Sequence, residues 1–264
     1  MKDVTFGQYY PGNSFLHKLD ARVKILLSIA FIVAVFLVKE YHFWAFLLLA
    51  GFVILSVLVA RVSVFRGIKS IRGVLFFVVF SAVLQIFFNR NGTVLWEWQF
   101  IHITDDGLLT AAYVACRIVL IVMGTSVLTL TTTPVAIADG IESLLTPLKW
   151  VKFPVHEFAL IMSIALRFIP TLMDETDRII RAQKARGADF ESGNLFRRAK
   201  ALVPILIPLL ISAFRRADEL GDAMDARCYA GSKNRTKYKK LRLTWRDFVA
   251  AVLMGGLIAG AVLL

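Results

Sequence analysis

The sequence lacks the short motifs by which enzymes hold phosphates, nucleophiles or metal ions. No glycine is followed directly by lysine, which excludes the glycine-rich loop that cradles the phosphates of ATP. There is no G-x-S-x-G elbow and no H-E-x-x-H metal motif. The chain has only two cysteines, Cys116 and Cys228, so no disulfide framework is indicated. We therefore expect no catalytic site, no metal site and no cofactor, and any energy from ATP must come through a partner.

Acidic residues are also scarce, whereas apolar and basic residues are abundant. Hydrophobic residues make up 58% of the chain, and its mean hydropathy of +0.68 is too high for an ordinary soluble domain. Several segments must therefore lie in lipid, and we expect an all-α integral membrane protein. The net charge is +12, but the basic residues are concentrated in particular loops, as in the cytoplasmic loops of membrane proteins. This distribution argues against a nucleic-acid partner.

Five apolar segments are expected to form transmembrane helices, which need about 20 residues to cross a bilayer. They are residues 23–38, 43–60, 71–88, 108–130 and 248–264. The first is short, but Lys24 and Lys39 can extend their amines from its ends toward the lipid head groups. Asp20 precedes this helix and can cap its N-terminus. The fourth contains Arg117, whose charge either packs against a neighbouring helix or serves a function.

Two more apolar segments, residues 158–173 and 201–214, are short and are interrupted by proline. If they crossed the membrane as a hairpin from the inside, residues 174–200 would carry seven Lys and Arg residues to the outer side. Such a placement would violate the positive-inside rule. We therefore expect both segments to remain in the cytoplasm.

The chain then divides into four parts. Residues 1–22 are a cytoplasmic lead-in, and residues 23–133 hold four transmembrane helices. Residues 134–246 form a cytoplasmic domain of two long helices and a short surface helix, and residues 247–264 form the last transmembrane helix. The basic run at residues 233–242 is expected to lie against anionic membrane lipid.

The two long cytoplasmic helices are related by a weak internal repeat. A shift of 41 positions superposes Asp177 on Asp218, Ile179 on Leu220, Ala182 on Ala223, Ala185 on Ala226 and Arg186 on Arg227. Each copy begins apolar and becomes charged toward its end. In the first copy, Asp174 with Arg178 and Asp177 with Arg181 are spaced to support a helix.

Both copies end on an arginine close to a glycine. Gly187 directly follows Arg186 and is a natural residue to end a helix, and we expect Gly231 to play that part a few residues late in the second copy. An arginine at such a place can be a favourable surface cap and nothing more. Its occurrence twice in matched surroundings favours a function.

These helices resemble those of the T component, the transmembrane coupling subunit, of energy-coupling factor (ECF) transporters. The runs that carry the resemblance are Leu166-Arg167-Phe168-Ile169-Pro170-Thr171-Leu172, Ala182-Gln183-Lys184-Ala185-Arg186-Gly187, Arg216-Ala217-Asp218-Glu219-Leu220 and Ala226-Arg227-Cys228. Cys228 stands where glycine is common in the family.

The resemblance implies that Ala185-Arg186-Gly187 and Ala226-Arg227-Cys228 end two coupling helices and dock onto two ABC-type ATPase subunits. It implies a further partner, a membrane S component that binds the substrate, and uptake of a vitamin or metal ion across the bacterial plasma membrane. A T component dedicated to one substrate, such as cobalt, nickel or biotin, fits the same resemblance.

Two readings of other classes remain open. One is a membrane-embedded enzyme that acts on a lipid or isoprenoid and holds the head group with Arg117 and Arg167. No paired acids and no nucleophile lie near these two arginines in the sequence. The other is a passive membrane scaffold with basic cytoplasmic helices.

The distribution of charge yields a prediction about topology. The N-terminus and residues 134–246 are expected in the cytoplasm and the C-terminus outside, because the loops so placed inside carry nearly all Lys and Arg residues. A single cysteine at Gly193 should resist a membrane-impermeant label, whereas one in the loop of residues 89–107, whose Trp96 and Trp98 suit the membrane interface, should react. Labelling of Gly193 from outside would contradict this topology.

Overall fold

The computed structural model describes residues 9–38, 42–61, 72–88, 92–98, 101–151, 154–188, 190, 194–229, 231 and 243–263. The chain divides into two compact units. The span unit comprises Gly7–Ser143 and Lys240–Leu264, and the helix-pair unit consists chiefly of Leu144–Lys239. The basic run at residues 233–242 lies outside the described residues.

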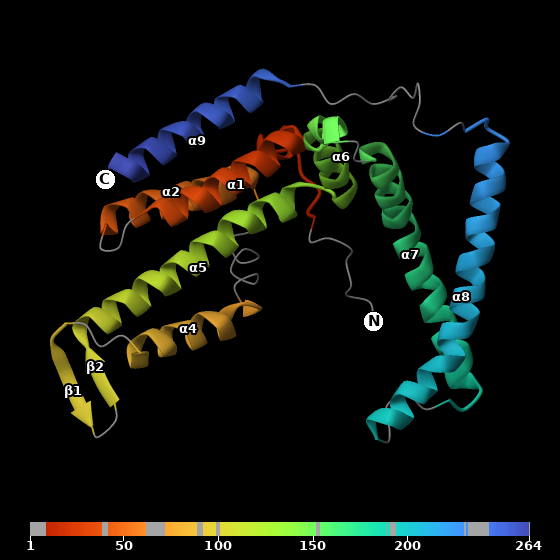
Figure 1. The fold of residues 1–264 in the computed structure, drawn as a ribbon, viewed down its shortest axis with the longest axis horizontal. Coiled ribbons are helices and arrows are strands. Elements are labelled where there is room, and N and C mark those ends of the chain that lie inside the picture. The colour runs from red at the N-terminus through yellow and green to blue at the C-terminus, as the bar shows by residue number, and fades with distance from the viewer. Residues whose placement is uncertain are drawn as a thin grey trace. The chain divides into compact units, whose positions relative to one another are not determined.

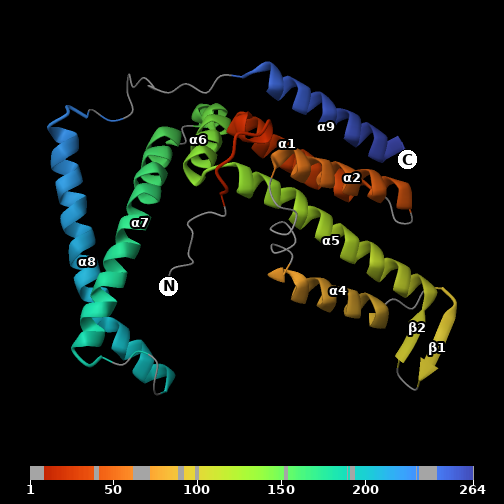
Figure 2. The ribbon, with the colours of Figure 1, turned by 180° about the vertical axis from the view of Figure 1, so that it is seen from behind.

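The span unit contains a helix for each of the five predicted transmembrane segments and, in addition, the short helix of residues 134–144 that was expected in the cytoplasmic domain. They are α1 (Ala21–Leu37), α2 (Phe43–Ala60), α4 (Leu75–Phe88), α5 (Asp105–Thr131), α6 (Pro134–Leu144) and α9 (Trp245–Leu263), preceded by the short 3₁₀ helix η1 (Leu16–Lys18). Helices α1, α2, α5 and α9 run side by side, and α4 packs along α5 (Figures 1 and 2). The all-α class is confirmed, and α2 has the predicted bounds.

The core of the span unit lies where α1, α2, α5 and α9 meet. Ala34, Val35 and Leu49 are completely buried there. Close packing of α1 on α5 depends on Gly124, because a Cβ at this position would collide with the ring of Phe31. The outward faces of these helices remain apolar, as expected of helices surrounded by lipid.

Between α4 and α5 the structure has a feature that the sequence analysis missed. Strands β1 (Val94–Trp98) and β2 (Ile101–Thr104) pair as an antiparallel hairpin, with Val94 opposite Thr104. The expectation was a loop with two interfacial tryptophans. Valine, isoleucine and tryptophan favour strands, and this preference prevailed over a short stretch that has no helical periodicity.

The helix-pair unit is built from two long helices. They are α7 (Val155–Ala185) and α8 (Leu195–Asp225), and the 3₁₀ helix η2 (Thr146–Val151) precedes α7. In both views α8 crosses α7 and is bent along its length (Figures 1 and 2). Pro204 and Pro208 lie inside α8, and proline removes a backbone donor and kinks a helix. Both helices begin earlier than their apolar runs.

Four described helices are long and apolar enough to cross a membrane, namely α2, α5, α7 and α9, and α4 is a shorter apolar helix of 14 residues. The set includes α7, which the charge distribution places in the cytoplasm. In α7 the apolar residues occupy the first half and the charged residues the second half. Of the residues of α7, Val155 alone is buried.

Buried polar groups join the start of α1 to α9 and to the end of α5. The Asp20 carboxylate caps α1 by accepting from the Arg22 backbone N–H, as predicted. Asp247, only 3% exposed, accepts from the Asp20 N–H at 2.8 Å and from the Thr244 N–H at 2.7 Å. The Asp247 carboxylate therefore fastens the first helix to the last, 227 residues apart.

Lys24 does not extend toward lipid head groups, so that expectation was wrong. Its side chain is buried, and the ammonium group donates to the Thr131 carbonyl at 3.0 Å and to the Thr132 hydroxyl at 3.1 Å. These acceptors lie at the C-terminal end of α5, where helix carbonyls lack partners and a cation is favoured. Lys39, named with Lys24, lies outside the described residues.

We predict that Asp247→Ala lowers the thermal stability of the purified protein strongly. The change leaves the buried Asp20 N–H without an acceptor, removes the cap of α9 and takes away an anion near Lys24, at a combined cost of about 3 kcal/mol. Asp105→Ala is the matched control, because this exposed carboxylate at the start of α5 contributes about 1 kcal/mol or less. Equal shifts in unfolding temperature for both variants would refute the prediction.

Candidate functional site

The first candidate motif closes α7 with a complete Schellman arrangement. Gly187 has a positive φ of 86°, the backbone conformation that glycine adopts without strain. Its N–H donates to the Lys184 carbonyl at 3.0 Å, and the Ala188 N–H donates to the Gln183 carbonyl at 3.0 Å. Arg186 sits just before this turn, with its own N–H still bonded to the last helical carbonyls.

The second motif repeats this geometry at the end of α8. The Cys228 N–H donates to the Asp225 carbonyl at 2.9 Å, and the Tyr229 N–H donates to the Met224 carbonyl at 3.1 Å. Each donor and each acceptor lies 41 positions after its counterpart in the first motif. The weak sequence repeat therefore corresponds to a repeated backbone structure.

One detail of the second motif corrects the sequence analysis. Gly231 was expected to end α8, but Cys228 occupies the turn position, with a φ of 55°. Gly231 also has a positive φ, of 80°, and lies beyond the motif. Because the six-residue closure fixes which residue must turn, Cys228 adopts the left-handed conformation although its Cβ disfavours it.

The arginines of both motifs are exposed to solvent. Arg186 and Arg227, like the alanine before each and the residue after each, are exposed. Within the part of the chain that the structure describes, neither guanidinium group makes a hydrogen bond or an ion pair. Neither side chain bonds to the last carbonyl oxygens of its helix, so any capping is limited to a charge near the negative end of the helix dipole. Both planar groups are instead available to a partner.

The charged pairs predicted along α7 do not form ion pairs. Within the described residues, Asp174 and Asp177 contact neither Arg178 nor Arg181 at ion-pair distance. An ion pair does join the two helices, since Arg216 Nη2 lies 2.8 Å from Glu175 Oε2. Glu175 was not among the predicted functional residues. The available signal was the repeat itself, because Glu175 and Arg216 are equivalent positions with opposite charges.

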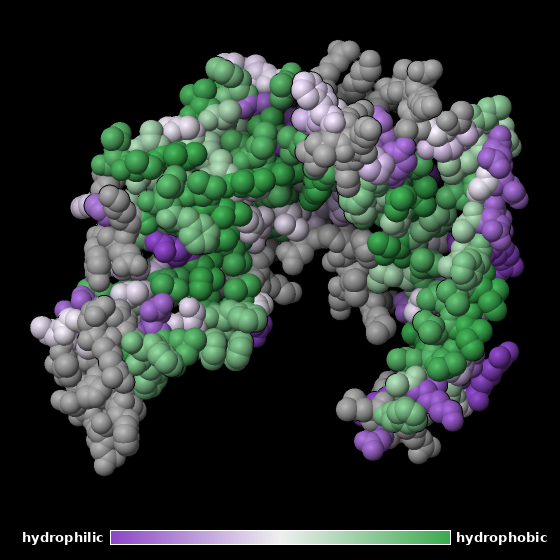
Figure 3. Space-filling view, in the orientation of Figure 1, coloured by the Kyte–Doolittle hydropathy of each residue, from purple (hydrophilic) through white to green (hydrophobic). Residues whose placement is uncertain are grey.

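The helix pair leaves large apolar side chains exposed. On α7 these include Phe158 and Ile161, and on α8 they include Leu206, Leu210 and Phe214, each at least 41% exposed. Figure 3 shows a large hydrophobic area on the helix pair, beside patches of hydrophilic side chains. An exposed apolar area of this kind is typical of a binding surface for protein or lipid.

Arg117 bonds to the C-terminal end of a neighbouring helix. Its Nη2 donates to the Val38 carbonyl at 3.0 Å, at the C-terminal end of α1, and its guanidinium lies 6.0 Å from the centre of the Phe46 ring. A cation at this place offsets the negative end of the α1 dipole. Arg167, its proposed companion in a lipid site, belongs to α7 in the other unit and is exposed. Of the two roles left open for Arg117, helix packing accounts for its contacts.

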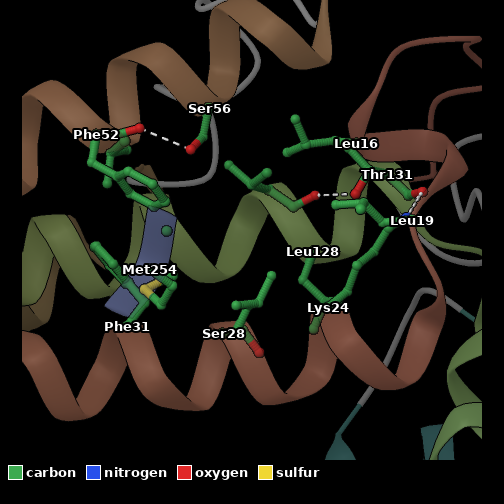
Figure 4. A pocket seen from close by; sticks show the side chains of 14 residues that line it. Leu16, Leu19, Lys24, Ser28, Phe31, Phe52, Ser56, Leu128, Thr131 and Met254 are labelled. Carbon is green, nitrogen blue, oxygen red and sulfur yellow. Dashed lines mark hydrogen bonds between the residues drawn. The ribbon is translucent and has the colours of Figure 1, made fainter. Parts of the chain in front are cut away.

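A cavity of about 90 Å³ opens between α1, α2 and α5 of the span unit. Figure 4 shows its apolar lining, including Phe31, Phe52 and Met254, with Lys24 at one end. The hydroxyls of Ser28, Ser56 and Thr131 each donate to a carbonyl of their own helix. The cavity therefore presents apolar surface and already bonded polar groups, which suits hydrocarbon better than a polar substrate.

We predict that Cys228→Gly stabilises the end of α8. Glycine removes the cost of a left-handed Cβ, about 1 kcal/mol, so exchange of the Tyr229 amide hydrogen should slow roughly fivefold. Gly187→Ala is the reciprocal variant and should speed exchange of the Ala188 amide by a similar factor, although its Cβ would meet no other atom. Unchanged exchange in both variants would show that these turns do not fix the helix ends.

Comparison with known proteins matches nearly the whole chain. A family model described as CbiQ, cobalt transport protein, matches residues 12–238. The energy-coupling factor transporter transmembrane protein EcfT of Ruminiclostridium cellulolyticum is 52% identical over 247 residues, which cover 94% of this chain and 91% of that protein. The EcfT of Clostridium kluyveri is 51% identical over 253 residues, covering 96% and 93%.

A third relative extends over the full length. The EcfT of Thermosediminibacter oceani is 46% identical over 263 residues, covering 100% of this chain and 98% of that protein. The matched region of the family model includes both arginine-ended helices. With its apolar helices, the chain is a multi-pass membrane protein. It belongs to the CbiQ family, which it shares with the transmembrane T components of ECF transporters.

Proposed function

We propose that this chain is the coupling subunit of an ECF-type importer and passes ATP-driven motion from two ABC-type ATPase subunits to a substrate-binding S component. The observation that carries the proposal is the pair of identical helix ends. Each presents an exposed arginine without a partner in the described structure, on a backbone closed by the same hydrogen bonds. Two like ends suit two like partner subunits.

Arginine suits this role for a physical reason. Its planar guanidinium can donate to several carboxylate or carbonyl oxygens at once, so it fixes direction as well as position. A rigid Schellman turn directly after it limits the freedom of the backbone that carries it. Movement of an ATPase groove would therefore be carried into α7 through Arg186 and into α8 through Arg227.

The topology and the domain boundaries follow the charge distribution. Residues 134–246 form the cytoplasmic coupling domain, and residues 1–22 with the N-terminus also lie inside. Residues 23–133 and 247–264 provide the transmembrane helices of a protein in the bacterial plasma membrane. This arrangement keeps α7 in the cytoplasm despite its length, because its charged half and the basic residues that follow it would be costly to move across.

The exposed apolar side chains of α7 and α8 are the surface proposed for the S component. They lie in the first half of α7 and between Phe196 and Phe214 on α8. The chain itself is proposed to be non-catalytic, since ATP hydrolysis belongs to its partners. The cargo is proposed to be a vitamin or metal ion, with a subunit dedicated to one substrate, such as cobalt, as the alternative that the family description favours.

We predict that the Arg186→Ala, Arg227→Ala double variant loses assembly with the ATPases and substrate uptake. If each arginine is a buried anchor in the complex, its loss should cost about 2 kcal/mol or more in affinity, roughly thirtyfold. Each single variant should weaken binding, and lysine at either site should restore it only in part, because lysine keeps the charge and loses the planar fork. The measurements are a pull-down of both ATPases and uptake into vesicles.

Arg178→Ala and Arg181→Ala are the matched controls. Both side chains are exposed on the same half of α7 and have no ion-pair partner among the described residues, so their removal should change affinity by less than about 0.5 kcal/mol. Normal assembly and uptake by the double variant at positions 186 and 227 would refute the coupling role.

A further inference from the structure

The ion pair between α7 and α8 joins equivalent positions of the internal repeat. Arg216 and Glu175 are 41 residues apart, which is the shift that superposes the two helix ends. The ion pair therefore lies at the same point of both copies of the repeat, which we call the centre of the helix pair.

Both arginine-ended arms have the same length from this centre. Arg186 lies 11 residues after Glu175, and Arg227 lies 11 residues after Arg216. With a rise of about 1.5 Å per residue, each arginine lies about 16 Å along its helix from the ion pair. Within this length of α7, the Gln183 side chain donates to the Pro204 carbonyl of α8 at 3.5 Å. The two arginines lie at equal distances from the central contact. The angle between α7 and α8 at this contact then determines how far one arginine moves when the other is displaced.

The crossing is held by polar contacts between partly buried groups. The side chains of Arg216 and Glu175 retain 33% and 23% exposure. Ser212, one turn before Arg216, is itself buried and lies close to the Glu175 carboxylate. The two equivalent positions carry opposite charges, which attract each other. Identical charges at this distance would repel each other.

Apolar packing beside the ion pair is incomplete. An open groove of about 320 Å³ separates the first half of α7 from the last half of α8, and Arg216 lies at its edge. Phe168 and Leu172 line it from α7, and both small residues, such as Gly221, and large ones, Leu220 and Met224, line it from α8. Side chains that leave such space do not by themselves fix the angle between the helices.

We propose that Glu175 and Arg216, supported by Ser212, are positioning residues that hold the crossing of α7 and α8, so that displacement of one arm is passed to the other. The proposal rests on the proposed function, in which each arm binds an ATPase. Without the ion pair, both arms could still dock through Arg186 and Arg227. Their movement would then change the crossing angle and would not reach the S component.

The distance between the two arms tests this directly. Ala182 and Ala223 are equivalent, exposed and one turn before the two motifs, so spin labels can be attached there through ketone-bearing amino acids that leave both native cysteines in place. Distance distributions are measured by pulsed electron resonance in the full-length protein in lipid nanodiscs, alone and with both ATPases. Arg216→Ala and Glu175→Gln should broaden the distribution, and the exchange of the two charges in Glu175→Arg, Arg216→Glu should narrow it again.

Arg215→Ala is the matched control. This neighbouring arginine is exposed, so its removal should leave the distance distribution narrow.

Arg216→Ala should also lower uptake per ATP hydrolysed by about two- to thirtyfold, the usual range for a coupling contact, and still retain both ATPases in a pull-down. A distribution as narrow in Arg216→Ala as in Arg215→Ala, or loss of ATPase binding in Arg216→Ala, would overturn the proposal. If the wild-type chain bound no ATPase, the coupling function would fail, and the distances in the isolated protein would still decide whether the ion pair holds the crossing.

Discussion

The need to satisfy the carbonyl groups at a helix C-terminus is the constraint on which this structure depends most. In α7 and α8 the backbone alone satisfies these carbonyls. Turns at Gly187 and Cys228 bring later N–H groups back to the last carbonyls of each helix. Since no side chain is needed for this task, Arg186 and Arg227 remain available to a partner. Under the proposed function, these two helix ends are the binding elements for the ATPases.

In the span unit, side chains and not the backbone satisfy the carbonyls at the helix C-termini. There, a buried lysine and a half-buried arginine supply the missing donors. Lys24 bonds to the end of α5, and Arg117 bonds to the carbonyl at the end of α1. Val38 and Thr131 are buried, which shields these carbonyls from water, so a basic side chain from a neighbouring helix is an effective replacement. This contrast separates the structural basic residues from the proposed functional ones more clearly than their positions in the sequence do.

Much of this could be predicted from sequence because it depends on local patterns. Apolar runs located the span helices, the bounds of α2 were correct, and Asp20 caps α1 as its residue type and position indicated. The contacts that could not be predicted are long-range. The residues next to Lys24 in the sequence do not indicate that its side chain bonds to Thr131. The ion pair between Glu175 and Arg216 depends on how the two helices cross. The cytoplasmic placement of α7 and α8 and the coupling role of the two arginine motifs remain predictions.

The two arms share a backbone design, but their electrostatic character is opposite. Over residues 176–187, four basic residues and one acidic residue give a net charge of +3. Over the equivalent residues 217–228, one basic residue and four acidic residues give −3. The helix pair is thus an electric dipole with a matching arginine at each pole. Long-range fields guide encounters before contact, so an approaching surface of either sign is drawn to one pole and repelled by the other.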